Sequence, residues 1–294
     1  MIPYVREIDF EYGRCDQVSP LIRRVIANNP SPFTYVGTGT YIVGRGEVAV
    51  IDPGPDDPAH LDAILAAIPG ERVAQILVTH HHSDHSPLAR PLQASTGAPI
   101  VGCAVGAAGE ADDGEVKMEA GHDADFHPDV SVCDGGEIAG PGWTFEAIPT
   151  PGHTSNHICY ALREENCLFS GDHIMGWSTT VITPPDGDMT DYLASLDLIR
   201  ARHFDTLWPT HGPPIREVDA FIEAYRAHRQ ERIDQILRAL TSGPGTITEL
   251  TPRLYADVDP RLWPAASRSM LAAMIHLERE GKVRADAGGT YRLA

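Results

Sequence analysis

The sequence predicts a layered α/β domain followed by a small winged-helix domain. Short β-rich runs alternate with helical patterns between residues 33 and 211, which is typical of sheets covered by helices. Four of these runs end shortly before histidine or aspartate residues. From about residue 220 the chain becomes mainly helical. We therefore expect a first domain at 1–222 and a second at 223–294.

Glycine-containing turns divide the start of the first domain into short strands. The β-rich runs at 33–36, 40–43 and 48–51 predict a meander of hairpins. Beyond them, strands alternate with helices whose apolar residues recur at helical spacing. We expect strands at 73–78, 100–102, 136–138, 143–148, 158–161, 167–170 and 206–210, and helices at 58–68, 88–95 and 189–203.

The second domain is predicted from three helical stretches and a terminal hairpin. The helices span 221–240, 248–255 and 264–280, and strands at 282–285 and 290–293 follow them. The two strands are joined by a glycine-containing turn. Three helices followed by a hairpin are typical of a winged helix, which is a variant of the helix-turn-helix.

Charge and hydropathy argue against several classes of partner. The net charge is −18, and residues 223–294 hold 11 basic and 9 acidic side chains, so the remaining 222 residues carry −20. A field this negative opposes long-range attraction of nucleic acid. No run approaches the roughly 18 apolar residues that span a membrane, and the N-terminus lacks an apolar signal segment. We expect a cytoplasmic protein with no membrane partner.

The cysteines support the same expectation. Their number is odd, they are widely spaced, and none forms a Cys-x-x-Cys pair. This pattern predicts free thiols that serve packing in a reducing compartment. The residues concerned are Cys15, Cys103, Cys133, Cys159 and Cys167.

A histidine-rich loop follows the apolar run at 76–78. His80 and His82 are two residues apart, and in an extended segment alternate side chains share a face, so both can hold one ion. Asp84 and His85 follow, and after a turn they would point towards a second ion nearby. Imidazole suits zinc, iron and nickel, and a carboxylate among histidines widens the choice towards iron and manganese.

Three more ligand-type side chains follow predicted strands. His153 comes after the run that ends at residue 148, Asp172 follows the run at 167–170, and His211 follows the run at 206–210. Since chance would not place ligand residues so regularly at strand ends, we expect these side chains to meet the histidine-rich loop.

The order His80-x-His82-x-Asp84-His85, then His153, Asp172 and His211, resembles the metallo-β-lactamase superfamily of dinuclear metallohydrolases. The resemblance spans about three quarters of the chain and matches all the ligand positions of that superfamily. It implies an αββα sandwich with the winged helix appended to it. It also implies an enzyme that uses a hydroxide bridging two divalent metal ions, zinc being expected, with iron or manganese as alternatives.

The resemblance further assigns roles to individual residues. His80, His82 and His153 would hold the first metal, and Asp84, His85 and His211 the second, with Asp172 bridging them. Asp52 would hydrogen-bond the metal loop. Asp84 would also orient the hydroxide or move its proton. His157 is a candidate for contacting substrate, and a hydrogen bond that fixes its loop is the equal alternative.

The substrate stays open between two enzyme classes. The opening at 28–34, the histidine-rich loop and the winged-helix tail together resemble the β-lactamase-like protein 2 group, which includes an endoribonuclease that prefers single-stranded RNA. That likeness implies a phosphodiester in single-stranded RNA. The rival is a small-molecule ester, thioester or lactone, as in glyoxalase II, although the tail does not resemble that enzyme's C-terminal part.

The winged helix raises a third reading of another class, a DNA-binding regulator with a vestigial metal site. The candidate recognition helix offers Arg268 alone among arginines in its first two turns, so sequence-specific DNA binding is not expected. A tail that shapes the substrate channel or a homodimer surface is the preferred interpretation. The acidic stretch at 107–129 is a candidate lid, in which His122 and His127 are read as solvated loop residues.

Overall fold

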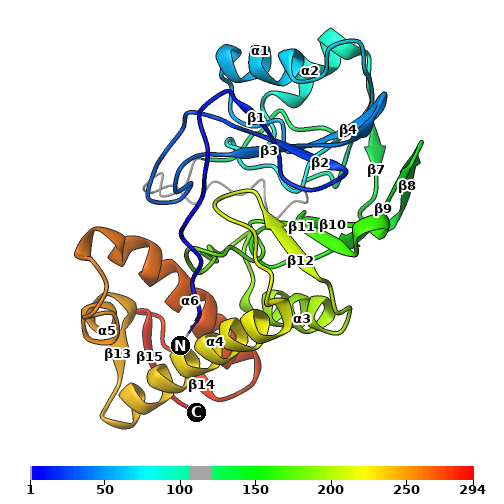
Figure 1. Cartoon of the computed structure of the whole chain (residues 1–294). Helices are drawn as coiled ribbons and strands as arrows, with labels where there is room; N and C mark the ends of the chain where they lie inside the picture. The colour runs from blue at the N-terminus through cyan, green and yellow to red at the C-terminus, as the bar shows by residue number, and fades with distance from the viewer. Residues whose placement is uncertain (1, 106–120) are drawn as a thin grey trace.

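The computed structural model describes residues 2–105 and 121–294, and it has four layers (Figure 1). Helices α1 (Pro58–Ala66) and α2 (Ala89–Thr96) cover the outer face of a first sheet. Their residues Ile64 and Leu92 pack into one apolar cluster with Val50 and Ile76 of that sheet. A second sheet lies beneath the first and is covered by α3 (Met189–Arg200) and α4 (Val218–Thr241). The expected αββα arrangement is confirmed.

The first sheet changes from antiparallel to parallel pairing at β4. Strands β1 to β4 pair antiparallel, and β4 to β7 pair parallel. Because parallel strands point the same way, the segments that leave β4 and β5 meet at one edge of the sheet. The strands follow the order of the chain: β1 (Cys15–Gln17), β2 (Ile22–Ile26), β3 (Gly39–Arg45), β4 (Glu47–Ile51), β5 (Arg72–Leu77), β6 (Ile100–Gly102) and β7 (Val130–Ser131).

The second sheet has the order β12-β11-β10-β9-β8. Its β11 and β12 are parallel neighbours, so the segments that follow them also leave at one edge. A short 3-10 helix at Arg163–Glu165 joins β10 to β11. The strands are β8 (Gly136–Gly140), β9 (Trp143–Pro149), β10 (Ile158–Leu162), β11 (Cys167–Gly171) and β12 (Thr206–Pro209).

Aromatic side chains fill the space between the two sheets. Trp143, Phe145 and Phe169 are fully buried in the same cluster as Tyr41 and Tyr160. The tyrosine hydroxyls also link the sheets, because Tyr41 donates to the carbonyl of Pro209 at 2.7 Å and Tyr160 donates to that of Val78 at 2.9 Å. Both acceptors stand just before predicted ligand loops. The core therefore fixes the distance between those loops.

The C-terminal part forms the expected winged helix. Its sheet has the order β13-β15-β14, and α5 begins with a capping box between Thr246 and Glu249. The predicted boundary at residue 222 stays a prediction, and α4 runs without a break through that position. The remaining elements are β13 (Gly245–Thr246), α5 (Ile247–Leu254), a 3-10 helix (Pro260–Leu262), α6 (Trp263–Arg279), β14 (Val283–Ala285) and β15 (Thr290–Leu293).

One local expectation differs from the structure, and most of another falls outside the described residues. The run at 33–36, expected as a strand, is a turn closed by an isolated bridge between Ser31 and Tyr35. Tyr35 has a φ of 58°, which is not a strand conformation. Of the candidate lid at 107–129, residues 107–120 lie outside the described residues. His122 is exposed, as expected of a solvated loop residue, although its backbone forms an isolated bridge with His82 and its ring stacks on that of His81.

The expectation of free thiols is wrong for two of the five cysteines. Cys103 and Cys133 form a disulfide that joins the segment after β6 to the segment after β7. Cys15 is free and exposed, whereas Cys159 and Cys167 are free and buried. Within residues 2–105 and 121–294, no helix is long and apolar enough to cross a membrane.

A buried ion pair attaches β2 to the turn before β5. Arg23 is 7% exposed and donates to Glu71 at 2.7 Å, and Glu71 also accepts from the amide of Gly46. Burial by itself raises the pKa of Glu71, but these hydrogen bonds outweigh it, so the pKa is lowered from 4.5. A lowered carboxyl pKa contributes stability above the unfolded pKa and loses it as the pH falls.

We therefore expect Glu71→Gln to lower the free energy of unfolding by about 3 kcal/mol at pH 7, because Arg23 is left buried without its counter-charge. The difference from the wild type should shrink as the pH falls below about 4.5. Urea unfolding at several pH values measures both effects. Glu47→Gln, which breaks an exposed pair with Arg72, is the control and should cost less than about 1 kcal/mol. Equal losses in the two variants would contradict the prediction.

Candidate metal centre

The histidine-rich loop leaves β5 and is buried although it is polar. His80 and His85 are not exposed at all, and Asp84 is 6% exposed. The backbone of the loop turns back on itself, because the amide of His85 donates to the carbonyl of His82. This turn separates His80 and His82 from Asp84 and His85. The two pairs consequently face two different groups of side chains.

Three histidines form the first group. The Nδ1 of His82 lies 3.0 Å from the Nε2 of His80 and 3.2 Å from the Nε2 of His153. His153 comes from the segment after β9 in the other sheet. Burial and the neighbouring imidazoles lower the pKa of His80 and His82 well below the ordinary value, so both are neutral. Neutral imidazoles converging at this spacing are suited to one metal ion.

The second group combines two carboxylates with two histidines. The Nε2 of His211, after β12, lies 3.1 Å from an oxygen of Asp84 and 3.5 Å from one of Asp172. The Nε2 of His85 lies 3.7 Å and 3.6 Å from the same two carboxylates. Asp172 also reaches the first group, with an oxygen 3.9 Å from the Nε2 of His153. Asp172 thus stands between the two groups.

Charge in the second group is strongly coupled. Burial by itself raises the pKa of Asp84 and Asp172, but His85 and His211 lower the pKa of both below the usual range. Burial conversely opposes protonation of His85 and His211, and the two carboxylates nevertheless raise the pKa of both. The carboxylates therefore attract positive charge to this point, as a divalent cation would require.

Contacts on the outer side of the rings orient His153 and His211. The Nδ1 of His153 hydrogen-bonds the carbonyl of Val181 at 2.8 Å, and that of His211 bonds the carbonyl of Gly37 at 3.2 Å. Each ring therefore donates from Nδ1 and turns its Nε2 inwards, the orientation typical of metal-bound histidine. The buried Nε2 atoms of His85 and His211 and an oxygen of Asp172 have no hydrogen-bond partner. These residues fit a pair of divalent metal ions.

Asp52 holds the loop from behind. It follows β4, is fully buried, and accepts hydrogen bonds from the amide and hydroxyl of Thr79, both at 2.8 Å. The same carboxylate accepts from Thr210 at 2.7 Å and lies 3.0 Å from the Nδ1 of His85. One side chain thus connects the segments that carry His80, His85 and His211. This arrangement agrees with the supporting role expected for Asp52.

His157 has both ring nitrogens engaged. Its Nε2 accepts from the amide of Asp172 at 3.2 Å, so the proton lies on Nδ1, which donates to Thr150 at 2.9 Å. The ring is 1% exposed and does not line the cavity described below. Of the two roles considered for His157, this favours positioning Asp172 over contact with substrate. Gly171 allows the close approach, because a Cβ there would lie 2.6 Å from the Nε2 of His157.

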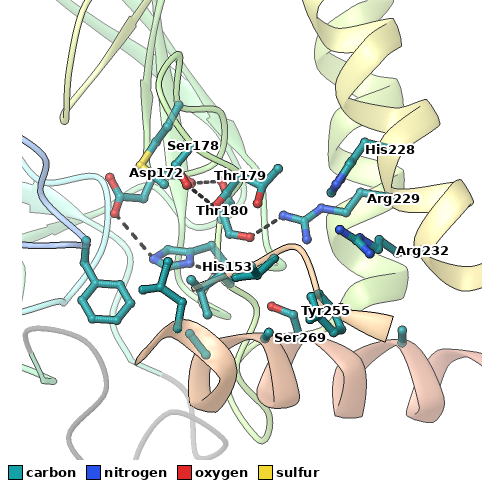
Figure 2. Close-up of a pocket in the computed structure, with 18 of the residues that line it drawn as sticks. His153, Asp172, Ser178, Thr179, Thr180, His228, Arg229, Arg232, Tyr255 and Ser269 are labelled. Carbon is teal, nitrogen blue, oxygen red and sulfur yellow. Dashed lines mark hydrogen bonds and ion pairs between the residues drawn. The ribbon is translucent and has the colours of Figure 1, made fainter. Parts of the chain in front are cut away.

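A cavity of about 300 Å³ opens onto the metal centre (Figure 2). His82, Asp84, His153 and Asp172 form part of its wall. The rest of the wall comes from segments that are distant in the sequence, so it could not be predicted from local pattern. The N-terminal Tyr4, the turn at 32–33, residues 175–181, and helices α4 and α6 all contribute. These segments share no local sequence pattern that would identify them as parts of one wall. The sequence supports only the general expectation that the tail shapes the substrate channel.

The geometry defines a class of protein, and sequence comparison identifies it. Residues 35–211 match the Metallo-beta-lactamase superfamily, and residues 246–290 match the Beta-lactamase associated winged helix domain. The chain belongs to the metallo-β-lactamase superfamily and is a hydrolase of that superfamily. The family resemblance predicted from the ligand spacing is confirmed.

Individual relatives extend the match to almost the whole chain. A Beta-lactamase-like protein 2 homolog from Caenorhabditis elegans is 31% identical over 91% of this chain and 88% of its own length. An Atrochrysone carboxyl ACP thioesterase from Aspergillus fumigatus is 29% identical over 90% of this chain and 84% of its own. The crystal structure of a beta-lactamase domain protein from Burkholderia ambifaria has a TM-score of 0.79 at 19% identity, covering 100% of this chain and 97% of that one. That likeness shows a shared fold.

Asp52→Asn should weaken metal binding, because an amide NH2 would face some of the donors that the carboxylate now accepts. We expect roughly a 10- to 100-fold loss of zinc affinity, the usual cost of removing such a supporting contact. Competition with a coloured chelator measures it. The control is Asp57→Asn, which changes the N-cap of α1, far from the ligands in sequence, and should leave zinc affinity unchanged. An unaltered affinity in Asp52→Asn would show that Asp52 does not support the centre.

Proposed function

We propose that the protein is a dinuclear metal-dependent hydrolase acting on small acyl thioesters or esters. The observation that carries this proposal is the cavity, which joins the metal-ligand side chains to a pocket with a mainly apolar wall. Its size is at the lower end of the range of small-molecule sites. An acyl group fits such a wall. The apolar side chains are Phe33, Met175, Val181, Met189, Ile233 and Ile236.

The assignment of ligands follows the two groups of side chains. His80, His82 and His153 would hold one ion, and Asp84, His85 and His211 the other, with Asp172 shared between them. Two bound divalent ions supply a hydroxide nucleophile near neutral pH and polarise a carbonyl oxygen. Zinc is the proposed metal, with iron or manganese as alternatives, because nitrogen and carboxylate ligands accept all three.

Asp84 has two features of a group that handles the nucleophile's proton. It lines the cavity, and the lowered pKa keeps it ionised at neutral pH, so it can accept a hydrogen bond from an attacking water. The neighbouring imidazole of His211 holds its carboxylate at 3.1 Å in a fixed orientation. We assign to Asp84 the orientation of the nucleophile in addition to metal binding.

The cavity favours a small acyl substrate over single-stranded RNA. Base stacking in RNA recognition uses aromatic platforms along an extended basic groove, whereas this wall is mainly apolar and the cavity volume of about 300 Å³ suits a small molecule. The relative named as an ACP thioesterase supports a thioester. The DNA-regulator alternative is not favoured either. The candidate recognition helix α6 directs Ala265, Ala266 and Ser269 into the cavity instead of presenting them to DNA.

Location and assembly stay predictions. A cytoplasmic location was inferred partly from free cysteines, and the Cys103–Cys133 disulfide removes part of that support because disulfides are rare in reducing compartments. Residues of α4 and α6 line the cavity, which supports the first of the two roles expected for the tail, that of shaping the substrate channel. A homodimer surface is the other.

The substrate class can be tested with a panel. The zinc-loaded protein should hydrolyse an acyl thioester of N-acetylcysteamine faster than a lactone, a β-lactam or single-stranded RNA. Asp84→Asn should lower kcat/KM by at least roughly a hundredfold, because it removes both a ligand and the orienting carboxylate. Removal of metal with a chelator should abolish turnover, and added zinc should restore it.

The control for Asp84→Asn is Asp62→Asn on the outer helix α1, which should keep wild-type activity. Metal-dependent cleavage of RNA without thioester turnover would overturn the proposed substrate class and select the phosphodiester alternative. Thioester turnover that persists in Asp84→Asn would overturn the role given to that residue.

A further inference from the structure

Helix α4 places three basic side chains on the wall of the cavity. His228, Arg229 and Arg232 lie across the cavity from the metal-ligand residues His153 and Asp172 (Figure 2). All three lie within little more than one turn of this helix. They come from the winged-helix side of the molecule, so the two ends of the cavity are built by different parts of the chain.

Arg229 is a buried cation without a carboxylate partner. It is 5% exposed, and its guanidinium donates to the carbonyl of Thr180. The guanidinium carbon lies 5.0 Å from the ring centroid of Tyr192 and 5.8 Å from that of Tyr225. Its Nε is buried and has no hydrogen-bond partner. In the described part of the chain, no aspartate or glutamate forms an ion pair with it.

Arg232 is partly buried and also lacks a carboxylate partner among the residues described. It donates to the carbonyl of Leu254 and to the side chain of Gln235, both at 2.9 Å, and lies over the ring of Tyr255 at 4.6 Å. Again, no described carboxylate forms an ion pair with it. Other arginines of the same helix differ, because Arg226 pairs with Asp197 and Arg238 with Glu231, outside the cavity. Unpaired arginines on α4 thus occur where the helix faces the cavity.

His228, the third basic residue, lies in an environment made positive by the two arginines. Burial, together with Arg229 and Arg232, lowers the pKa of His228 to about 4, so at neutral pH it is an uncharged ring. Its Nδ1 is buried without a hydrogen-bond partner. The carboxylates in the described cavity wall are Asp84 and Asp172, which belong to the metal centre. Nothing at the other end of the described wall balances the two guanidinium charges.

A buried charge without a counter-charge is costly, and an anion from outside would remove that cost. Arginine is suited to this task because its planar group binds carboxylate or phosphate through two hydrogen bonds. We propose that His228, Arg229 and Arg232 form an anion subsite, so that the substrate carries a carboxylate or phosphate remote from the bond that is hydrolysed. The link to hydrolysis rests on the proposed function, whereas the anion subsite itself does not.

Binding to the zinc-loaded protein tests the subsite without turnover. Calorimetry would compare glutaramate, which has a carboxylate at one end and an amide at the other, with neutral pentanamide and with propyl phosphate. We expect at least one of the two anions to bind roughly tenfold or more tightly than pentanamide. A preference for glutaramate places the anion on the acyl group, and a preference for propyl phosphate indicates a phosphate on the substrate's other part.

Variants distinguish anion binding at this subsite from anion binding to the zinc ions. Arg232→Gln should remove most of the preference for the anion, whereas Arg238→Gln, on the same helix outside the cavity, should retain it. Arg229→Lys keeps the charge and should retain part of the preference, while Arg229→Gln should lose it; circular dichroism establishes that each variant is folded. Equal affinity for anions and pentanamide, or an anion preference unchanged in Arg232→Gln, would overturn the subsite.

A kinetic comparison connects the subsite to the reaction. With N-acetylcysteamine thioesters of glutarate and pentanoate, Arg232→Gln should raise KM for the glutaryl compound about tenfold more than for the pentanoyl compound, with kcat little altered in both. Absence of turnover with either thioester would contradict the proposed function alone, because the calorimetric result still decides the subsite.

Discussion

The carboxylate of Asp52 is the interaction on which the rest of the site depends. It lies between the two sheets at the edge where β4, β5 and β12 end, and it accepts from Thr79 and Thr210 while contacting His85. Such a buried anion is tolerable because several donors surround it. The loop after β5 and the segment after β12 are thereby held in register. Ligands from both sheets can then converge without a continuous element joining them.

The aromatic core between the sheets helps to fix the positions of the segments that Asp52 connects. Tyr41 and Tyr160 cross from one sheet to the other and end on the carbonyls of Pro209 and Val78, next to the segments that carry His211 and His80. Close packing makes such a core resist small shifts. Two kinds of interaction therefore position the candidate metal-binding side chains: apolar packing between the sheets and hydrogen bonds within the site. His157 adds a further constraint through the amide of Asp172.

The sequence predicted the fold and the meeting of the ligand side chains because both follow from local pattern. A strand that ends before a histidine can be recognised without knowing its neighbours. The cavity could not be predicted in this way, since Tyr4, Trp177, Arg229 and Ala265 come together only through the packing of distant segments. The Cys103–Cys133 disulfide was missed for the same reason. The run at 33–36 was misread because β propensity says nothing of the positive φ at Tyr35.

The continuity of α4 through the expected domain boundary has an evolutionary consequence. The side chains that could hold metal ions come from residues 80–211, whereas much of the opposite wall comes from residues 228–273. Mutations in the tail can therefore reshape what is recognised while the reactive centre is inherited intact. Relatives that share this architecture can differ in substrate specificity while keeping the same type of reaction. For the same reason, removing residues 223–294 would leave the cavity open on one side.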